Sequence, residues 1–255
     1  MNMDRIFYLP IISGTLAALV LAWGGLLLRL RNESLAALSY AQAGGLGMVA
    51  APLLGWATLP GTLLGAAAAA LVKPWLARSA DGLIVLLLAT WGLSLLLVAN
   101  LPSGEHIGRM LIDGQLYFTR LEHAIGLAIG LLVASALLPG LSRRIQRELL
   151  FPAQPMSRMH SLLIEFILAG CLALAAASIG VMAAFALAFI PARIAFRFAS
   201  RWSHAVMLAL ALGLLAHLVA FFLALHFDQP YGPVLTLILL VAALASAPLA
   251  KNTKA

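Results

Sequence analysis

The sequence predicts an all-α, polytopic membrane protein with eight to nine transmembrane helices. Of its 255 residues, 63% are hydrophobic and 10% are charged. Soluble domains are roughly half apolar and a quarter charged, so this balance indicates a lipid environment. Several uninterrupted apolar runs also reach the ~20 residues that one helix needs to cross a hydrocarbon core. The runs do not alternate polar and apolar residues, which argues against a membrane β-barrel.

Charged, Pro-containing and Gly-containing segments divide the chain into nine expected passes. The segment RLRNES follows the first pass, TLPG is expected to form a tight turn after the second, and ARSAD follows the third. The first apolar run lacks the cleavage-site pattern of a signal peptide, so we interpret it as a membrane helix. An arrangement of eight passes, with 160–197 as one broken element, is the alternative. The nine passes are expected at 8–29, 35–57, 59–76, 81–101, 122–140, 160–180, 181–197, 204–226 and 232–249.

The basic residues predict how these passes are oriented. The net charge is +7, but Lys and Arg punctuate the apolar runs and form no stripe of the kind that binds nucleic acid. Threading nine passes through a membrane places Arg5, Arg109 and Arg120 on one side and the other basic residues on the opposite side. The positive-inside rule makes the second side cytoplasmic, so the N-terminus is expected outside and the C-terminus inside. The cytoplasmic set is Arg29, Arg31, Lys73, Arg78, Arg143, Arg144, Arg147, Arg158, Arg193, Arg197, Arg201, Lys251 and Lys254.

The segments between the passes are too short to form a soluble domain, so 1–255 is interpreted as a single transmembrane domain. The longest inner segment, 141–159, is basic and amphipathic at its start, and Pro152 and Pro155 interrupt it. No G-x-x-x-x-G-K-[ST] phosphate loop occurs, so the chain is not expected to hydrolyse ATP by that mechanism. Any energy input would come from a partner subunit or an ion gradient.

Few polar side chains lie at membrane depth, where each costs free energy and is therefore a functional candidate. They are Gln42, Glu165, His217 and, near a helix end, Arg193. Glu165 lies about one turn into its helix, where it is expected to snorkel or to pair with a basic residue. His217 lies mid-helix, where an interhelical hydrogen bond is favoured over a role as a ligand. The single cysteine, Cys171, is interpreted as a small core residue.

Four residues of the expected outer loops are weak candidates for metal ligands. Glu105 and His106 are adjacent in one loop, and His226 and Asp228 are close together in another. Their side chains suit zinc or manganese. No spacing fixes the two pairs together, however, so ordinary solvated loop residues are the alternative.

Two motifs occur in order in the last third of the chain. From Ile179 the sequence reads IGVMAAFALAFIPARIAFRFA, and one helix later it reads FDQPYGPVLTLILL. These motifs resemble those of the permease subunits of zinc/manganese-type ABC importers, which carry IP-A-x-x-A before basic residues and later Asp-x-Pro-x-Gly. Weaker similarity extends back through LIDGQL, LLLATWGLSLLL and AQAGGLG, so the resemblance covers most of the chain. The matching residues are Gly180, Ile190, Pro191, Ala192, Ala195, Arg197, Asp228, Pro230 and Gly232.

The physical properties of the motif residues give further expectations. Gly180 permits a sharp chain reversal. Pro191 is expected to kink its helix or to end it before Arg193, because proline removes a backbone donor. DQPYGP is expected to be a turn in which Asp228 can cap the next helix.

The resemblance implies a metal-ABC-permease-like bundle that is a non-catalytic subunit of an importer in the bacterial inner membrane. It implies a homodimer or heterodimer of permeases, cytoplasmic ABC ATPase subunits that use ATP and Mg, and an extracytoplasmic substrate-binding protein. No cofactor is expected on this chain itself. The segment 141–159 would then contact the ATPase through residues that also suit lipid headgroups. These are Arg143, Arg144, Arg147, Pro152 and Arg158.

The second pass departs from the family pattern. Relatives commonly carry Asp-x-x-x-His there, two ligands one helical turn apart that suit a divalent transition metal. Leu38 and Gln42 stand at those positions, and neither is a good ligand for zinc or manganese. With His217, they are expected to line the translocation path. The cargo ligands would then lie elsewhere, or the cargo would be a chelated metal, or a second permease would complete the site.

Small residues on the second pass recur at every fourth position, a pattern that favours close helix contact in lipid. One row is Ala37, Ala41 and Gly45, and the other is Ser39, Ala43 and Gly47. Three other functions remain open from the sequence. They are an ABC permease for a different nutrient, a non-transporting scaffold or sensor with a degenerate permease fold, and an ion-coupled carrier, which the scarcity of intramembrane charge disfavours.

Overall fold

The computed structural model describes residues 8–76, 80–101, 108, 111, 114, 116, 121–150 and 157–249. Over these ranges the regular structure is helical, and nine helices are long and apolar enough to cross a membrane. The predicted all-α class is therefore confirmed, and nine passes are favoured over eight. The helices are α1 (Tyr8–Leu30), α2 (Ser34–Ala50) with a short 3₁₀ continuation η2 (Ala51–Leu54), α3 (Thr58–Leu76), α4 (Ala80–Asn100), α6 (Leu121–Leu150), α7 (Arg158–Ile179), α8 (Val181–Phe198), α9 (Trp202–His226) and α10 (Tyr231–Leu249).

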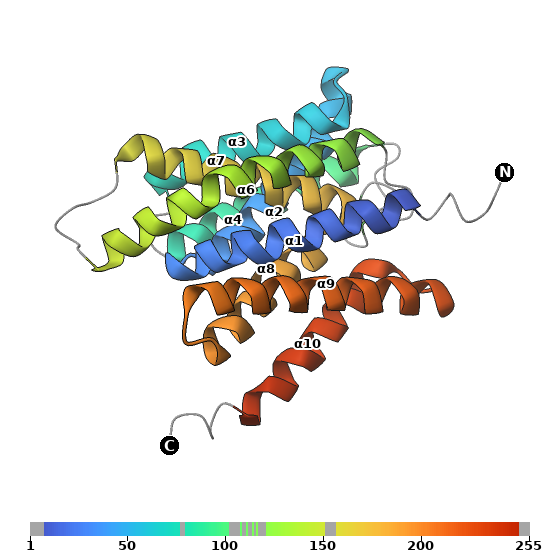
Figure 1. Cartoon of the computed structure of the whole chain (residues 1–255). Coiled ribbons are helices and arrows are strands. Elements are labelled where there is room, and N and C mark those ends of the chain that lie inside the picture. Colours follow the sequence, from blue (N-terminus) through green and yellow to red (C-terminus); the bar gives the residue numbers. More distant parts are fainter. Residues whose placement is uncertain are drawn as a thin grey trace.

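Helix α2 is the central helix of the bundle. It contacts α3, α4, α7 and α8, and most of its residues are buried. Helix α1 packs beside this group against α6, α8 and α9. In Figure 1, α9 runs along one side of the bundle and α10 leaves it at a steep angle. Exposed apolar side chains concentrate on helices such as α4, α9 and α10, as expected for surfaces that face lipid.

The contact between α2 and α3 depends on the predicted small residues. A Cβ atom added to Gly47 would lie 2.1 Å from the carbonyl oxygen of Gly61, and one added to Gly65 would lie 2.2 Å from that of Ala43. The hydroxyl of Ser39 donates to the carbonyl oxygen of Leu83 on α4 at 3.1 Å. Because lipid provides no hydrophobic force between helices, such close backbone contact is a main source of attraction. The expectation for the row Ser39, Ala43 and Gly47 is thus confirmed.

Two helix boundaries differ from the sequence prediction. The tight turn after α2 lies at Gly55, in a left-handed conformation (φ 69°), and the TLPG residues belong to the first turns of α3. Pro60 is tolerated there because the first amides of a helix have no intrahelical acceptor. Helix α6 contains Pro139 and continues beyond the expected end at residue 140 to Leu150. Its buried Leu141 and Ile145, four residues apart, keep one face of this extension in the core.

Three connections need unusual backbone conformations. Asn32 (φ 59°) ends α1, and the next amide, of Glu33, donates to the carbonyl of Leu28. Asp228 (φ 50°) ends α9 in the same way, with the amide of Gln229 donating to Ala224. Both are the 6→1 hydrogen bond of a Schellman motif, which satisfies carbonyls at a helix end.

Gly180 is the third such connection and is the single residue between α7 and α8. It lies at φ 90° and ψ 152°, a conformation that residues with side chains rarely adopt. A Cβ atom added to Gly114 would lie 2.2 Å from the carbonyl carbon of Ile179, so this reversal is also tightly packed. The predicted sharp reversal at Gly180 is therefore confirmed.

Candidate functional site

The face of α2 that carries Leu38 and Gln42 is its least enclosed side. Leu35, Leu38 and Leu46 are half-buried, whereas Ala36, Tyr40 and Ala43 on other faces are buried. Gln42 belongs to the same stripe and is 9% exposed. Its amide makes no hydrogen bond to any residue that the structure describes. A primary amide at membrane depth without a partner among the described residues is available to contact cargo or a second subunit.

Tyr40 lies on the opposite face of α2. Each helical residue turns the side chain by about 100°, so Tyr40 points about 160° away from both Leu38 and Gln42. Its side chain is fully buried, and its hydroxyl donates a hydrogen bond to Oε2 of Glu165 on α7. One face of α2 is thus fixed to α7 while the other face is open.

Four charged side chains surround this hydrogen bond. Arg31 Nη2 and Lys73 Nζ each lie 2.6 Å from Glu165 Oε1. Lys73 Nζ also lies 2.6 Å from Glu33 Oε2, and Arg31 Nε lies 3.2 Å from that same oxygen. These contacts close a circuit of alternating charge, which we call the four-charge ring (Arg31, Glu33, Lys73 and Glu165). Two positive and two negative charges balance, so burial of the ring leaves no net charge in the bundle.

The four-charge ring joins three segments of the chain. Arg31 and Glu33 come from the turn between α1 and α2, Lys73 from the end of α3, and Glu165 from the beginning of α7. Lys73 is 4% exposed and Glu165 is 2% exposed, so both lie inside the protein. The prediction that Glu165 pairs with a basic residue is confirmed. The prediction for Lys73 was an inner-surface charge, and its burial beside Glu165 was not foreseen.

His217 forms a second buried polar contact, between α9 and α10. Its Nδ1 lies 2.7 Å from the hydroxyl oxygen of Tyr231, and the side chain is fully buried. A Cβ atom added to Gly14 on α1 would lie 2.2 Å from His217 Cε1, so the imidazole fills the space that this glycine leaves. The interhelical hydrogen bond expected for His217 is thus present, and its place in the translocation path stays a prediction.

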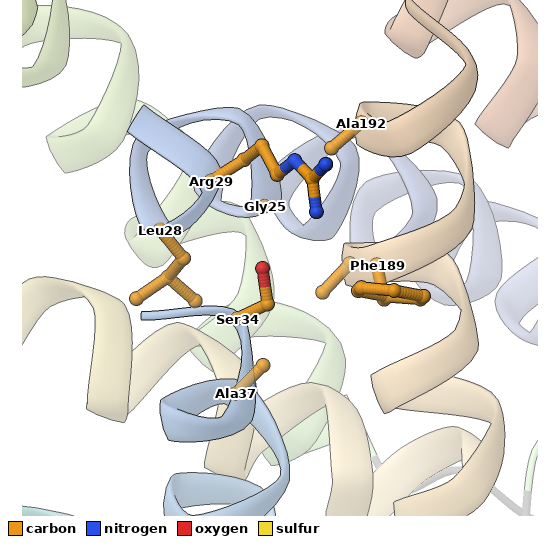
Figure 2. A pocket seen from close by; sticks show the side chains of 8 residues that line it. Gly25, Leu28, Arg29, Ser34, Ala37, Phe189 and Ala192 are labelled. Atoms are coloured by element: carbon orange, nitrogen blue, oxygen red, sulfur yellow. The ribbon is translucent and has the colours of Figure 1, made fainter. Parts of the chain in front are cut away.

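A shallow pocket opens where α1, α2 and α8 meet. Figure 2 shows the Arg29 guanidinium and the Ser34 hydroxyl at this pocket, with Phe189 opposite. A Cβ atom added to Gly25 would lie 1.8 Å from the carbonyl oxygen of Ala188, so α1 and α8 are in backbone contact at its floor. The family-motif residue Ala192 also lines the pocket.

Both the sequence and the fold of this chain are similar to those of known proteins. The family whose pattern matches this chain is described as the ABC 3 transport family, and the match spans residues 3–250. The chain belongs to the ABC 3 transport family. It is accordingly a permease subunit of an ABC transporter and a multi-pass membrane protein.

Two solved structures share the fold of this ABC 3 permease. PsaBC from Streptococcus pneumoniae, solved in complex with Fab, has a TM-score of 0.81 at 17% identity, over 95% of this chain and 91% of that chain. A transporter described as of the metal-chelate ABC type, in an inward-facing conformation, has a TM-score of 0.68 at 19% identity. That match covers 94% of this chain and 83% of the other. No curated protein sequence matches this chain.

The motif residues of the ABC 3 permease have distinct structural positions. Helix α8 runs through Pro191 to Phe198, so it does not end before Arg193 as the proline suggested. Burial of Ala192 and Ala195 against Ala22 of α1 supports the helix beyond the proline. Arg197 Nη2 donates to the carbonyl oxygen of Ala247 at 2.8 Å, which satisfies a free acceptor in the last turn of α10.

The turn before α10 corrects one expectation. The Asp228 side chain makes no hydrogen bond within the described residues, so it does not cap α10. Its backbone instead terminates α9. Pro230 precedes α10, and Gly232 is buried in the first turn of that helix.

The expected ATPase-contacting segment is partly described. Arg143, Arg144 and Arg147 lie exposed on the last turns of α6, and Arg158 is exposed at the first position of α7. Arg144 contacts His160, which ties the end of α6 to the beginning of α7. Pro152 lies outside the described residues.

The candidate metal ligands do not gather into a site in the described part of the chain. His226 and Asp228 are exposed at the α9–α10 turn. Glu105 and His106 lie outside the described residues. Within the ranges given above, no three His, Cys, Asp or Glu residues are close enough to hold a metal ion together.

Proposed function

We propose that this ABC 3 permease is the membrane-spanning subunit of an importer for a divalent metal ion or a metal complex. ATP with Mg would be hydrolysed by a cytoplasmic ABC ATPase subunit, and an extracytoplasmic binding protein would deliver the cargo. The observation that carries the proposal is the family match over residues 3–250. The absence of a phosphate-loop motif from the sequence agrees with an ATPase site on a separate chain. Two permeases, identical or different, would form the path between them.

A complexed or chelated metal is the cargo that α2 supports best. Leu38 and Gln42 offer a hydrocarbon side chain and a neutral amide. The resemblance to zinc/manganese-type permeases implies two metal ligands at these positions. A bare Zn²⁺ or Mn²⁺ ion would need imidazole, thiolate or carboxylate groups. A metal that keeps its own ligands would not need them, and an amide can hydrogen-bond to such ligands. The likeness in fold to a transporter described as of the metal-chelate type agrees with this choice.

The orientation that we propose has the N-terminus outside and the C-terminus in the cytoplasm of a bacterial inner membrane. Thirteen of the sixteen basic residues were assigned to one side. Contacts support a common end for several of them, since Arg31 and Lys73 share Glu165 near the beginning of α7, and Arg144 contacts His160. The positive-inside rule makes this end cytoplasmic.

Cellular metal content tests the proposed cargo. Cells with and without the gene are grown under zinc and manganese starvation, and both metals are measured by mass spectrometry. The proposal predicts lower content of one metal and slower growth without the gene. Unchanged metal content and growth would overturn the claim of metal import and favour a permease for a different nutrient or a non-transporting scaffold.

Substitution of Gln42 tests the proposed path. Gln42→Leu removes the amide but keeps the size of the side chain, so uptake is expected to fall while membrane abundance stays normal. Gln229→Leu, in the exposed α9–α10 turn, is the matched control and is expected to leave uptake unchanged. A fall in abundance for Gln42→Leu, with normal uptake per molecule, would instead assign Gln42 to helix packing.

A further inference from the structure

The four-charge ring has a consequence for how α2 moves. Apolar side chains between α2 and α7 gain little from contact with one another, because lipid tails are equally apolar. The tight contact of Gly44 with Ala173 fixes how closely the two helices approach. Ion pairs act differently in this environment. A slip of α7 along α2 would separate Glu165 from Arg31 and Lys73 and leave unpaired charges in the bundle.

Stability by itself is a weak explanation for the ring. Removing charges from water costs free energy that ion pairing only partly returns, so apolar residues of similar size often serve as well or better. The ring is also incompletely satisfied, since Arg31 Nη1 is buried without a hydrogen-bond partner among the described residues. What a buried ion pair does provide is a single permitted arrangement of the segments that it connects.

The position of the ring connects two regions of the proposed transporter. Glu165 lies seven residues after Arg158, the first residue of α7, which is a rise of about 10 Å along the helix. Arg158 closes the segment that we expect to contact the ATPase. Through the Tyr40 hydroxyl and the α1–α2 turn, the ring holds the face of α2 opposite Leu38 and Gln42.

We propose that the four-charge ring joins α2 to α7, so that α2 and its Leu38–Gln42 face move with α7 during transport. This inference rests on the proposed function, in which a cytoplasmic ATPase drives transport, and it takes the movement to enter the permease at the beginning of α7. Without the ring, α7 would keep its tight contact with α2 at Ala173 but lose its ionic connection to the α1–α2 turn, and we expect less of the movement that begins at the ATPase to reach the path.

A thiol-labelling experiment tests this joint without knowledge of the cargo. Cys171→Ala removes the native thiol, and Leu38→Cys introduces a reporter on the open face of α2. Membrane vesicles containing the permease with its ATPase are treated with a maleimide, with and without ATP and vanadate. We expect ATP to change the labelling rate about tenfold with the ring intact, as in a shift between two conformations. We expect a change of less than about twofold in Lys73→Met/Glu165→Met, which leaves Arg31 paired with Glu33.

The outcomes separate the inference from the proposed function. Equal ATP effects with the ring intact and the ring broken would overturn the inference and leave the proposed function standing. No ATP effect with the ring intact would contradict ATP-driven movement of α2, and both would fall. If the double variant is absent from membranes, Arg31→Met/Glu165→Met decides, because it also removes the ion pairs of α7 and leaves Lys73 paired with Glu33. An undiminished ATP effect in Arg31→Met/Glu165→Met would overturn the inference, and Ser178→Ala on α7 is the control expected to behave as the parent.

Discussion

Two buried polar contacts hold helices together in this permease, and they differ in charge. The four-charge ring joins the α1–α2 turn, α3 and α7 through ion pairs. In two of these pairs, a nitrogen of Arg31 or Lys73 lies 2.6 Å from Oε1 of Glu165. His217 and Tyr231 join α9 to α10 through one hydrogen bond. Loss of Glu165 leaves unpaired charge, whereas loss of the Tyr231 hydroxyl removes an uncharged partner from His217, whose Nε2 already has no hydrogen-bond partner among the described residues. The comparison teaches that ion pairs fix the register of the α1–α2 turn, α3 and α7 at one end of the bundle, whereas an uncharged hydrogen bond links α9 to α10.

The largest effect is expected from Glu165→Gln. This change leaves two cations, Arg31 and Lys73, with only Glu33 as a partner, so it is expected to destabilise the fold by ~3–5 kcal/mol. Thermal unfolding of the purified permease in detergent measures the loss. Asp81→Asn, which removes an exposed acid from the first turn of α4, is the matched control with an expected change below ~0.5 kcal/mol. The Lys73→Met/Glu165→Met variant is expected to be more stable than Glu165→Gln. The reverse order would contradict the view that an unpaired buried charge causes the loss of stability.

A substitution that adds steric bulk between α2 and α3 tests how firmly the helices around α2 are held. Gly47→Ala places a methyl group against the carbonyl oxygen of Gly61 and is expected to separate α2 from α3 at a cost of ~1–3 kcal/mol. Gly92→Ala, on α4, meets no atom within 4 Å and is the control, expected to be neutral or slightly stabilising. Equal unfolding temperatures for the two variants would show that close α2–α3 contact contributes little.

A smaller effect is expected on the α9–α10 side. Tyr231→Phe removes the hydrogen bond to His217 and is expected to cost ~0.6–1.7 kcal/mol, the range measured for hydrogen bonds between membrane helices. A double-mutant cycle with His217→Leu isolates the pair. A coupling energy as large as the loss in Glu165→Gln would contradict the contrast between the two contacts.

The smallest effect is expected at the turn between those two helices. Asp228 adopts a left-handed conformation, and Asp228→Gly is expected to stabilise the permease by no more than ~1 kcal/mol because glycine has no Cβ penalty there. Asn32→Gly, at the matching position after α1, is a second test of the same rule. A loss of stability in Asp228→Gly would show that the carboxylate has a role that its backbone conformation does not explain.

The sequence predicted the helices well because hydrophobic run length is a local property. The expected passes at 160–180 and 181–197 correspond to α7 and α8, and Gly180 marked their boundary. The exceptions are places where packing overrides a local signal. Pro139 and Pro191 lie within helices because buried neighbours such as Ile145 and Ala195 keep the following turns in the core.

The polar contacts were only partly predictable. Glu165 was expected to find a basic partner, but its partners are 134 and 92 residues distant in the chain, and periodicity within one helix gives no register between helices. Lys73 offered one neglected signal, since it precedes Pro74 inside an apolar run. For His217, the interhelical hydrogen bond followed from its mid-helix position, while Tyr231 as its partner required the three-dimensional structure.

The single residue between α7 and α8 gives the permease a mechanical property. Two backbone torsions at Gly180 set the angle between a helix of 22 residues and one of 18 residues. Helix α7 is about 33 Å long, so a rotation of about 5° at Gly180 would displace its far end by about 3 Å. A rigid rotation of α7 about Gly180 would therefore move Arg158 farthest, and the packing of Gly114 against Ile179 opposes such a rotation.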